Sequence, residues 1–274
     1  MVTINTNYAA AFASNAAKQT SAGLNSAMEK LSTGSRINYA RDDAAGVAIS
    51  TRLTAEIEGL SMASRNAADA QSMLDTAEGG LQETHNVLLR MRELAVQSVN
   101  DTMTNADRAH TDAEFKQLQA EIDRISANTT FAGQKLLDGS VASFKFQIGE
   151  GSGQTLTVAI SDMDSTALAV STSHEDLVNQ VNATAAITDI DTAIETVSTQ
   201  RAALGAYSNR LGSTMSNLDQ INVNLSASKG RIADADFAAE TGNLAKNQIL
   251  QQAATAMIAQ ANASKSSVMS LLQS

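Results

Sequence analysis

The sequence contains no cysteine, no proline and no tryptophan, and only 3% of its 274 residues are aromatic. Without cysteine the chain cannot form disulfides, thiolate metal sites or a cysteine nucleophile. The absence of proline is typical of long uninterrupted helices, because a proline inside a helix costs about 3 kcal/mol. Aromatic side chains dominate most cores. A chain that is 43% hydrophobic yet so poor in aromatics is therefore expected to bury narrow helix seams rather than one thick core.

Negative charge is concentrated in the middle of the chain. The formal net charge is −10, whereas residues 1–40 are slightly basic and residues 236–274 carry equal numbers of basic and acidic residues. An acidic middle argues against nucleic acid and against insertion into an anionic membrane. The sequence has no apolar run long enough to span a membrane, and its first residues lack the features of a secretory signal. If the protein leaves the cell, we expect export without a cleaved signal peptide.

Apolar residues spaced alternately by three and four positions predict long amphipathic helices. One run extends from Ile49 to Ala95, a shorter one covers 115–125, and another extends from Leu177 to Leu225. A helix of some 50 residues is about 75 Å long, too long for a compact globule. Between the second and third runs, apolar residues at every second position predict a β-hairpin. They are Phe144, Phe146, Ile148, Leu156, Val158 and Ile160.

These patterns predict a mainly α fold, with long antiparallel helices in a coiled-coil-like bundle and a small β-hairpin region at about 131–175. Residues 1–42 and 230–274 are expected to form an inner pair of terminal helices, and residues 43–229 an outer bundle capped by the hairpin. Neither terminal helix has enough apolar surface to be stable alone. We therefore expect burial against the other terminal helix and against further copies of the chain. The predicted assembly core is Phe12, Leu24, Met28, Leu31, Leu250, Met257, Ile258, Val268 and Leu271.

Two similar segments interrupt the helical patterns near the chain ends, "LSTGSRINYARDDAAGVAIS" at 31–50 and "GRIADADF" at 230–237. The adjacent carboxylates of Asp42 and Asp43 resemble an acid–base pair, but neighbouring residues of a helix do not face each other. Helix capping and ion pairs between the two segments are the favoured interpretation. The predicted joint between helices consists of Gly34, Arg36, Arg41, Asp42, Asp43, Gly230, Arg231, Asp234 and Asp236, with the two arginines of the first segment reaching the aspartates of the second.

Other candidate sites lack the spacing that chemistry requires. His85, His110 and His174 are far apart and have no second ligand at metal-binding spacing. The segment "GEGSGQT" lacks the lysine of a phosphate-binding loop and precedes a strand pattern. We therefore predict a protein that is not an enzyme, with no catalytic residues, no cofactor and no metal.

Several stretches together resemble bacterial flagellin. They are "LLRMRELAVQSVN", "QLQAEIDRIS", "TTFAGQKLLDG", "RAALGAYSNRL", "QILQQAATAMIAQAN" and the two joint segments. They cover both ends of the chain in the order of that family, and the middle has room for no large variable domain, so the chain resembles a short flagellin. The resemblance implies a structural subunit that self-assembles into the flagellar filament, the propeller for swimming. The alternative is a hook–filament junction protein, whereas a signalling coiled coil is disfavoured by the nested joints.

The resemblance also implies partners and a location. The expected partners are other copies of the chain in a helical filament, a type III-like export apparatus, an export chaperone, the filament cap and hook-junction proteins. The expected location is the extracellular flagellum. Some members of the family are recognised by a host innate immune receptor, and Arg90, Leu94 and Glu114 match the residues that form that face.

Overall fold

The computed structural model describes residues 6–171 and 177–273, with side chains as far as residue 267. The described residues form mainly helices, with four short strands. The helices are α1 (Tyr8–Thr33), α2 (Ala44–Ser98), α3 (Asn105–Asn128), α4 (Gln180–Ala233) and α5 (Phe237–Gln273). The strands are β1 (Thr130–Phe131), β2 (Gln134–Lys135), β3 (Ser143–Gln147) and β4 (Thr155–Ala159). The predicted mainly α fold with a small β-hairpin region is confirmed.

The chain divides into two compact units. The first comprises Met1–Ile57 and Val223–Ser274, and the second comprises Glu58–Asn222. These limits lie further from the chain ends than the sequence-based limits at residues 42 and 230. The sequence pattern marks the turns, whereas the first turns of α2 and the last turns of α4 group with the terminal helices.

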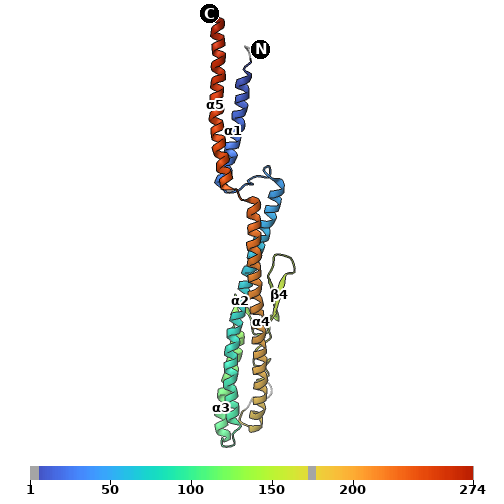
Figure 1. Cartoon of the computed structure of the whole chain (residues 1–274). Helices are drawn as coiled ribbons and strands as arrows, with labels where there is room; N and C mark the ends of the chain where they lie inside the picture. The colour runs from blue at the N-terminus through green and yellow to red at the C-terminus, as the bar shows by residue number, and fades with distance from the viewer. Residues whose placement is uncertain (1–5, 172–176, 274) are drawn as a thin grey trace. The chain divides into compact units, whose positions relative to one another are not determined.

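The second unit has a conventional apolar core between α2, α3 and α4 (Figure 1). Its largest fully buried side chains include Leu74, Leu81, Leu88, Met91 and Phe115, which occupy the helix seam positions that the three-and-four spacing predicts. Dense packing of such side chains supplies most of the stability of a helix bundle. Among the described residues, the largest fully buried side chains all lie in the second unit.

Capping and a buried arginine organise the turn between α2 and α3. The Thr104 side chain accepts from the Asp107 backbone N–H at 3.3 Å, and the Asp107 carboxylate accepts from the Thr104 N–H at 3.1 Å. Together these two bonds form a capping box at the start of α3. Arg108 is buried, and its guanidinium donates to the carbonyl oxygens of Ser98 and Asn100 at 2.7 and 3.1 Å. The bond to Ser98 satisfies a carbonyl group that the end of α2 leaves without a helical partner, and the bond to Asn100 holds the turn that follows.

The hairpin of β3 and β4 has the predicted strands, with Phe144 opposite Val158 and Phe146 opposite Leu156. It lies along the sides of α2 and α4 instead of capping the bundle. Hydrogen bonds connect Asn66 of α2 to the Gln147 carbonyl at 3.1 Å and Gln200 of α4 to the Ala159 carbonyl at 3.1 Å. The prediction of a cap is wrong because the apolar face of the hairpin needs the apolar sides of the long helices to cover it.

Among the described residues, no helix has a stretch long and apolar enough to cross a lipid bilayer.

Two neighbouring leucines test the position of this core. Leu88 has no exposed surface, whereas Leu89 on the same helix is 44% exposed. We expect Leu88→Ala to lower the free energy of unfolding by about 2–5 kcal/mol, because it leaves a cavity among packed side chains. Leu89→Ala should change it by less than about 0.5 kcal/mol. Urea denaturation of the free chain measures both, and equal effects would contradict the assigned helix orientation.

Candidate functional site

The terminal helices α1 and α5 lie side by side and antiparallel in the first unit (Figure 1). Their Cα atoms approach within 8 Å of each other along the pair. This close approach is allowed by a seam of small residues, in which the side chains of Ala13, Ala27 and Ala254 are buried. Alanine removes little apolar surface from water when it is buried, compared with leucine or phenylalanine. The terminal pair therefore has a thin core.

Most of the larger apolar side chains of the terminal pair are exposed. Phe12 is 79% and Met257 is 61% exposed. Of the predicted assembly core, Met28 and Leu250 are also exposed, Leu24, Leu31 and Ile258 are half-buried, and Val268 and Leu271 lie outside the described side chains. The spacing of apolar residues in the sequence does not indicate the exposed Tyr8, Phe237 and Ile249. These three residues lie off the single seam that the spacing indicates.

The two joint segments meet through their backbones. An isolated antiparallel bridge pairs Ser35 with Asp234. The Arg36 N–H donates to the Ala233 carbonyl at 2.7 Å, and the Ala235 N–H donates to the Gly34 carbonyl at 2.9 Å. Both joints therefore lie at one level, as predicted.

Glycine ends the first helix, as the sequence indicates. Gly34 follows α1 with a φ of +69°, in the left-handed region that glycine adopts without steric cost. Gly230 has a different role from the predicted one, since α4 continues through it as far as Ala233. A Cβ at Gly230 would lie 2.7 Å from the Asp234 carboxylate. The break between α4 and α5 is therefore shorter than predicted, and Arg231, which bonds to the Ser228 hydroxyl at 3.1 Å, belongs to α4.

The arginines of the first joint do not form the predicted ion pairs with the second. The Arg36 guanidinium donates to the Ile232 carbonyl at 2.7 Å, which satisfies a carbonyl group at the end of α4. Arg41 lies 3.8 Å from the Asp42 carboxylate and stacks over the Tyr39 ring at 4.7 Å. The sequence indicates opposite charges in the two segments, but backbone carbonyl groups without helical partners compete for the same guanidinium.

Three of the four joint aspartates accept hydrogen bonds from backbone N–H groups. Asp43 caps α2, where its carboxylate accepts from the Gly46 N–H at 2.9 Å, and Asp236 caps α5, where it accepts from the Ala238 N–H at 2.9 Å. Asp42 is not a helix cap, which corrects the prediction for that residue. Its carboxylate accepts from the N–H groups of Tyr39 and Asn38 at 3.0 and 3.1 Å, and these two bonds hold the pKa of Asp42 below its usual value of 3.8.

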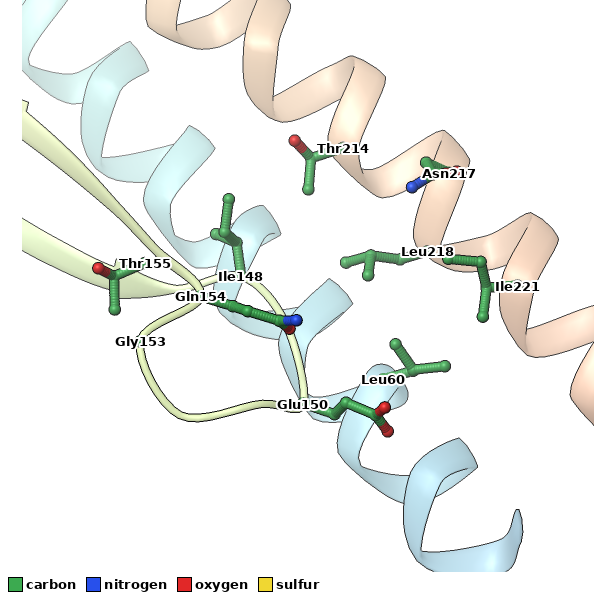
Figure 2. A pocket seen from close by; sticks show the side chains of 11 residues that line it. Leu60, Ile148, Glu150, Gly153, Gln154, Thr155, Thr214, Asn217, Leu218 and Ile221 are labelled. Atoms are coloured by element: carbon green, nitrogen blue, oxygen red, sulfur yellow. The ribbon is translucent and has the colours of Figure 1, made fainter.

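A cleft of about 390 Å³ lies in the second unit between the hairpin loop and the helices (Figure 2). Leu60 of α2 and Leu218 and Ile221 of α4 form its apolar wall. Glu150 in the loop is the single ionisable residue among those that line it. With a single ionisable side chain in its lining, this cleft holds no acid–base pair.

The residues that match the immune-receptor face are split between surface and core. The Arg90 guanidinium donates to Glu114 Oε1 at 2.8 and 2.9 Å, and both side chains are about half exposed. Leu94 is only 2% exposed and packs in the core of the second unit. Leu94 therefore cannot contribute contact surface in this fold, because the helix seam needs its side chain. The sequence match alone does not distinguish seam from surface.

The acid titration of Asp42 tests the assigned joint geometry. Because its pKa in the folded chain is lower than in the unfolded chain, its bonds stabilise the joint fully above pH 3.8. They are lost as the pH falls through the lowered pKa. We expect the NMR shifts of the Asn38 and Tyr39 amide protons to titrate with a midpoint below pH 3.8, and Asp42→Asn to abolish this titration. A midpoint at or above pH 3.8 would contradict the hydrogen bonds described here.

Comparisons with known proteins agree with this geometry. Residues 4–142 match the bacterial flagellin N-terminal helical region, and residues 187–272 match the bacterial flagellin C-terminal helical region. Flagellin from Halalkalibacterium halodurans is 47% identical over 247 residues, which cover 90% of this chain and 91% of the relative. The flagellar filament 33 kDa core protein of Treponema phagedenis is 41% identical over 284 residues, which cover 98% and 99%.

A solved structure agrees with the sequence comparisons. The crystal structure of Bacillus cereus flagellin matches 56% of this chain and 88% of its own, with 34% identity and a TM-score of 0.51. The family models cover both terminal regions, which contain the helix pair and its joints. The chain belongs to the bacterial flagellin family.

Proposed function

We infer that this chain builds the bacterial flagellar filament by assembling with copies of itself. The observation that carries this conclusion is the match of both terminal regions to flagellin, together with relatives such as the 33 kDa filament core protein. Flagellins are structural proteins, and swimming motility follows from the role of the filament. A hook–filament junction protein is not favoured, because both family models and the relatives at 41–47% identity are flagellins or filament proteins.

We propose that the exposed apolar side chains of α1 and α5 form the contacts between copies. In the single chain Phe12, Leu250 and Met257 lie in water, and large exposed apolar side chains gathered on one element mark interaction surfaces. The terminal segments carry little net charge, so packing many of them together costs little electrostatic repulsion. The residues of the predicted assembly core, together with Phe237 and Ile249, would then be covered by neighbouring copies.

We propose that the joint holds the terminal helices in a fixed relation to each other during assembly. A backbone bridge between Ser35 and Asp234 connects the two segments, and the carboxylates of Asp43 and Asp236 cap the helices that follow. The carboxylates therefore act as acceptors of backbone N–H groups. Carboxylates that are bonded in this way support our proposal of a protein without catalytic residues. The cleft in the second unit, where Glu150 is the single ionisable residue of the lining, supports the same proposal.

Export without a cleaved signal peptide is also part of this proposal. Passage through a narrow type III-like channel requires an unfolded chain, and a chain without cysteine forms no disulfides that would block it. The absence of proline removes slow prolyl isomerisation from folding at the far end. We propose that an export chaperone, the filament cap and hook-junction proteins contact the chain on this route to the cell exterior.

We further propose that the Arg90–Glu114 pair is the part of the immune-receptor face available on a free chain. Both side chains are exposed and already held together by two hydrogen bonds. A receptor would meet them without a conformational cost in the helices. Leu94 would contribute only by supporting α2 from within the core.

A charge at Met257 tests the assembly surface. Met257→Asp should leave the unfolding of the free chain nearly unchanged, because the side chain is 61% exposed there. Polymerisation should be lost, because burial of an unpaired carboxylate between copies costs several kcal/mol. Sedimentation and electron microscopy of concentrated protein measure this, with Met257→Leu as the matched control that still forms filaments. Normal filaments from the aspartate variant would contradict the proposed contact.

A further inference from the structure

An ion pair connects the two terminal helices beside the joint. The Lys30 ammonium group lies 3.7 Å from Glu240 Oε1, and the side chains are only 28% and 14% exposed. Among the ion pairs of the described residues, this one has both side chains well shielded from water. Shielding from water lowers the local dielectric. The sign of the partner's charge therefore changes the interaction energy more here than at an exposed ion pair.

Lys30 also faces the first joint. It lines a polar cavity of about 400 Å³ together with Arg36, Asp42 and Asp43. Its positive charge is one of the influences that lower the pKa of Asp42. A single ammonium group therefore faces both α5 and the loop that follows its own helix.

Both charges occupy the helix ends that favour them. Lys30 lies in the last turn of α1, and Glu240 lies in the first turn of α5. A cation near a helix C-terminus and an anion near an N-terminus are each stabilised by the helix dipole. The helix dipoles therefore favour this ion pair where the end of one helix meets the start of another, which is the arrangement of an antiparallel pair.

The buried positions of the seam, Ala13, Ala27 and Ala254, do little to select a partner or a register. Alanine side chains fit against each other in several registers, because they lack the shape that interlocks larger knobs and holes. Polar contacts follow one register instead. From Asn7 through Ser21 to Lys30 along α1, the partners step back along α5 from Ala261 through Gln251 to Glu240. Polar pairs of this kind can specify the register of helices at some cost in stability.

We propose that Lys30 and Glu240 are a specificity-determining pair, which makes α1 select the α5 of its own chain in one register. The many similar, alanine-rich terminal helices in a filament offer wrong partners from neighbouring copies. A correct pair within each chain gives every copy the same apolar surface to present to its neighbours. This inference rests on the proposed self-assembly of the chain.

Charge reversal and charge exchange test the pair. We expect Lys30→Glu and Glu240→Lys each to slow seeded filament elongation about tenfold or more, because like charges then meet in a shielded site. The double variant that exchanges the two charges should recover most of that rate, although its charges oppose the helix dipoles. Lys145→Glu is the control, because it reverses the charge of an exposed lysine on β3 in the second unit, outside both terminal helices, and should elongate nearly as wild type.

A mixture of the two single variants separates a pair within one chain from a pair between copies. If the pair forms within each chain, the mixture elongates as slowly as either variant alone. Recovery in the mixture, no recovery in the double variant, or normal elongation of the single variants would overturn the proposal. Thermal unfolding followed by circular dichroism checks that each variant retains the fold of the second unit. Wild-type chain that forms no filaments under the same conditions would instead contradict the proposed function.

Discussion

The alanine seam between α1 and α5 is the constraint on which the rest of the account depends. Small side chains allow the two backbones to approach closely, but they bury too little apolar surface to stabilise two long helices. The large side chains that could have formed a core, such as Phe12 and Met257, are exposed instead. The terminal pair is therefore incomplete on its own, and in the proposed filament neighbouring copies cover its exposed apolar side chains. The second unit is the opposite case, with leucine, methionine and phenylalanine packed inside.

The joint connects the two helix ends that meet beside this pair through backbone hydrogen bonds. The last carbonyl groups of α4 accept hydrogen bonds from across the joint. The Arg36 guanidinium donates to the Ile232 carbonyl, and the Arg36 backbone N–H donates to the Ala233 carbonyl. At the start of α5, the Asp236 carboxylate accepts a hydrogen bond from a backbone N–H group of the first turn. These polar groups of the helix ends are thus bonded by the opposite segment or by a nearby carboxylate. Residues that could serve chemistry in another fold are used here for the geometry of helix ends.

Sequence periodicity predicted the helices well because long helices repeat one signal many times. The caps at Asp43 and at Thr104 were also predictable, since each depends on residues within one turn. Contacts across the joint were not, because several partners compete for one guanidinium and only the fold decides among them. Leu94 illustrates the same limit: its neighbours Arg90 and Glu93 are exposed, and a rotation of one position separates surface from core.

The rate of methionine oxidation, followed by mass spectrometry, tests most directly whether neighbouring copies cover the exposed side chains of the terminal helices. Thioether sulfur reacts with peroxide according to its exposure, and Met257 is 61% exposed in the single chain whereas Met73 in the second unit is 3% exposed. In the free chain Met257 should oxidise rapidly while Met73 is protected. In assembled filaments the account predicts that Met257 becomes protected as well. Equal oxidation rates of Met257 in the free chain and in filaments would contradict the account.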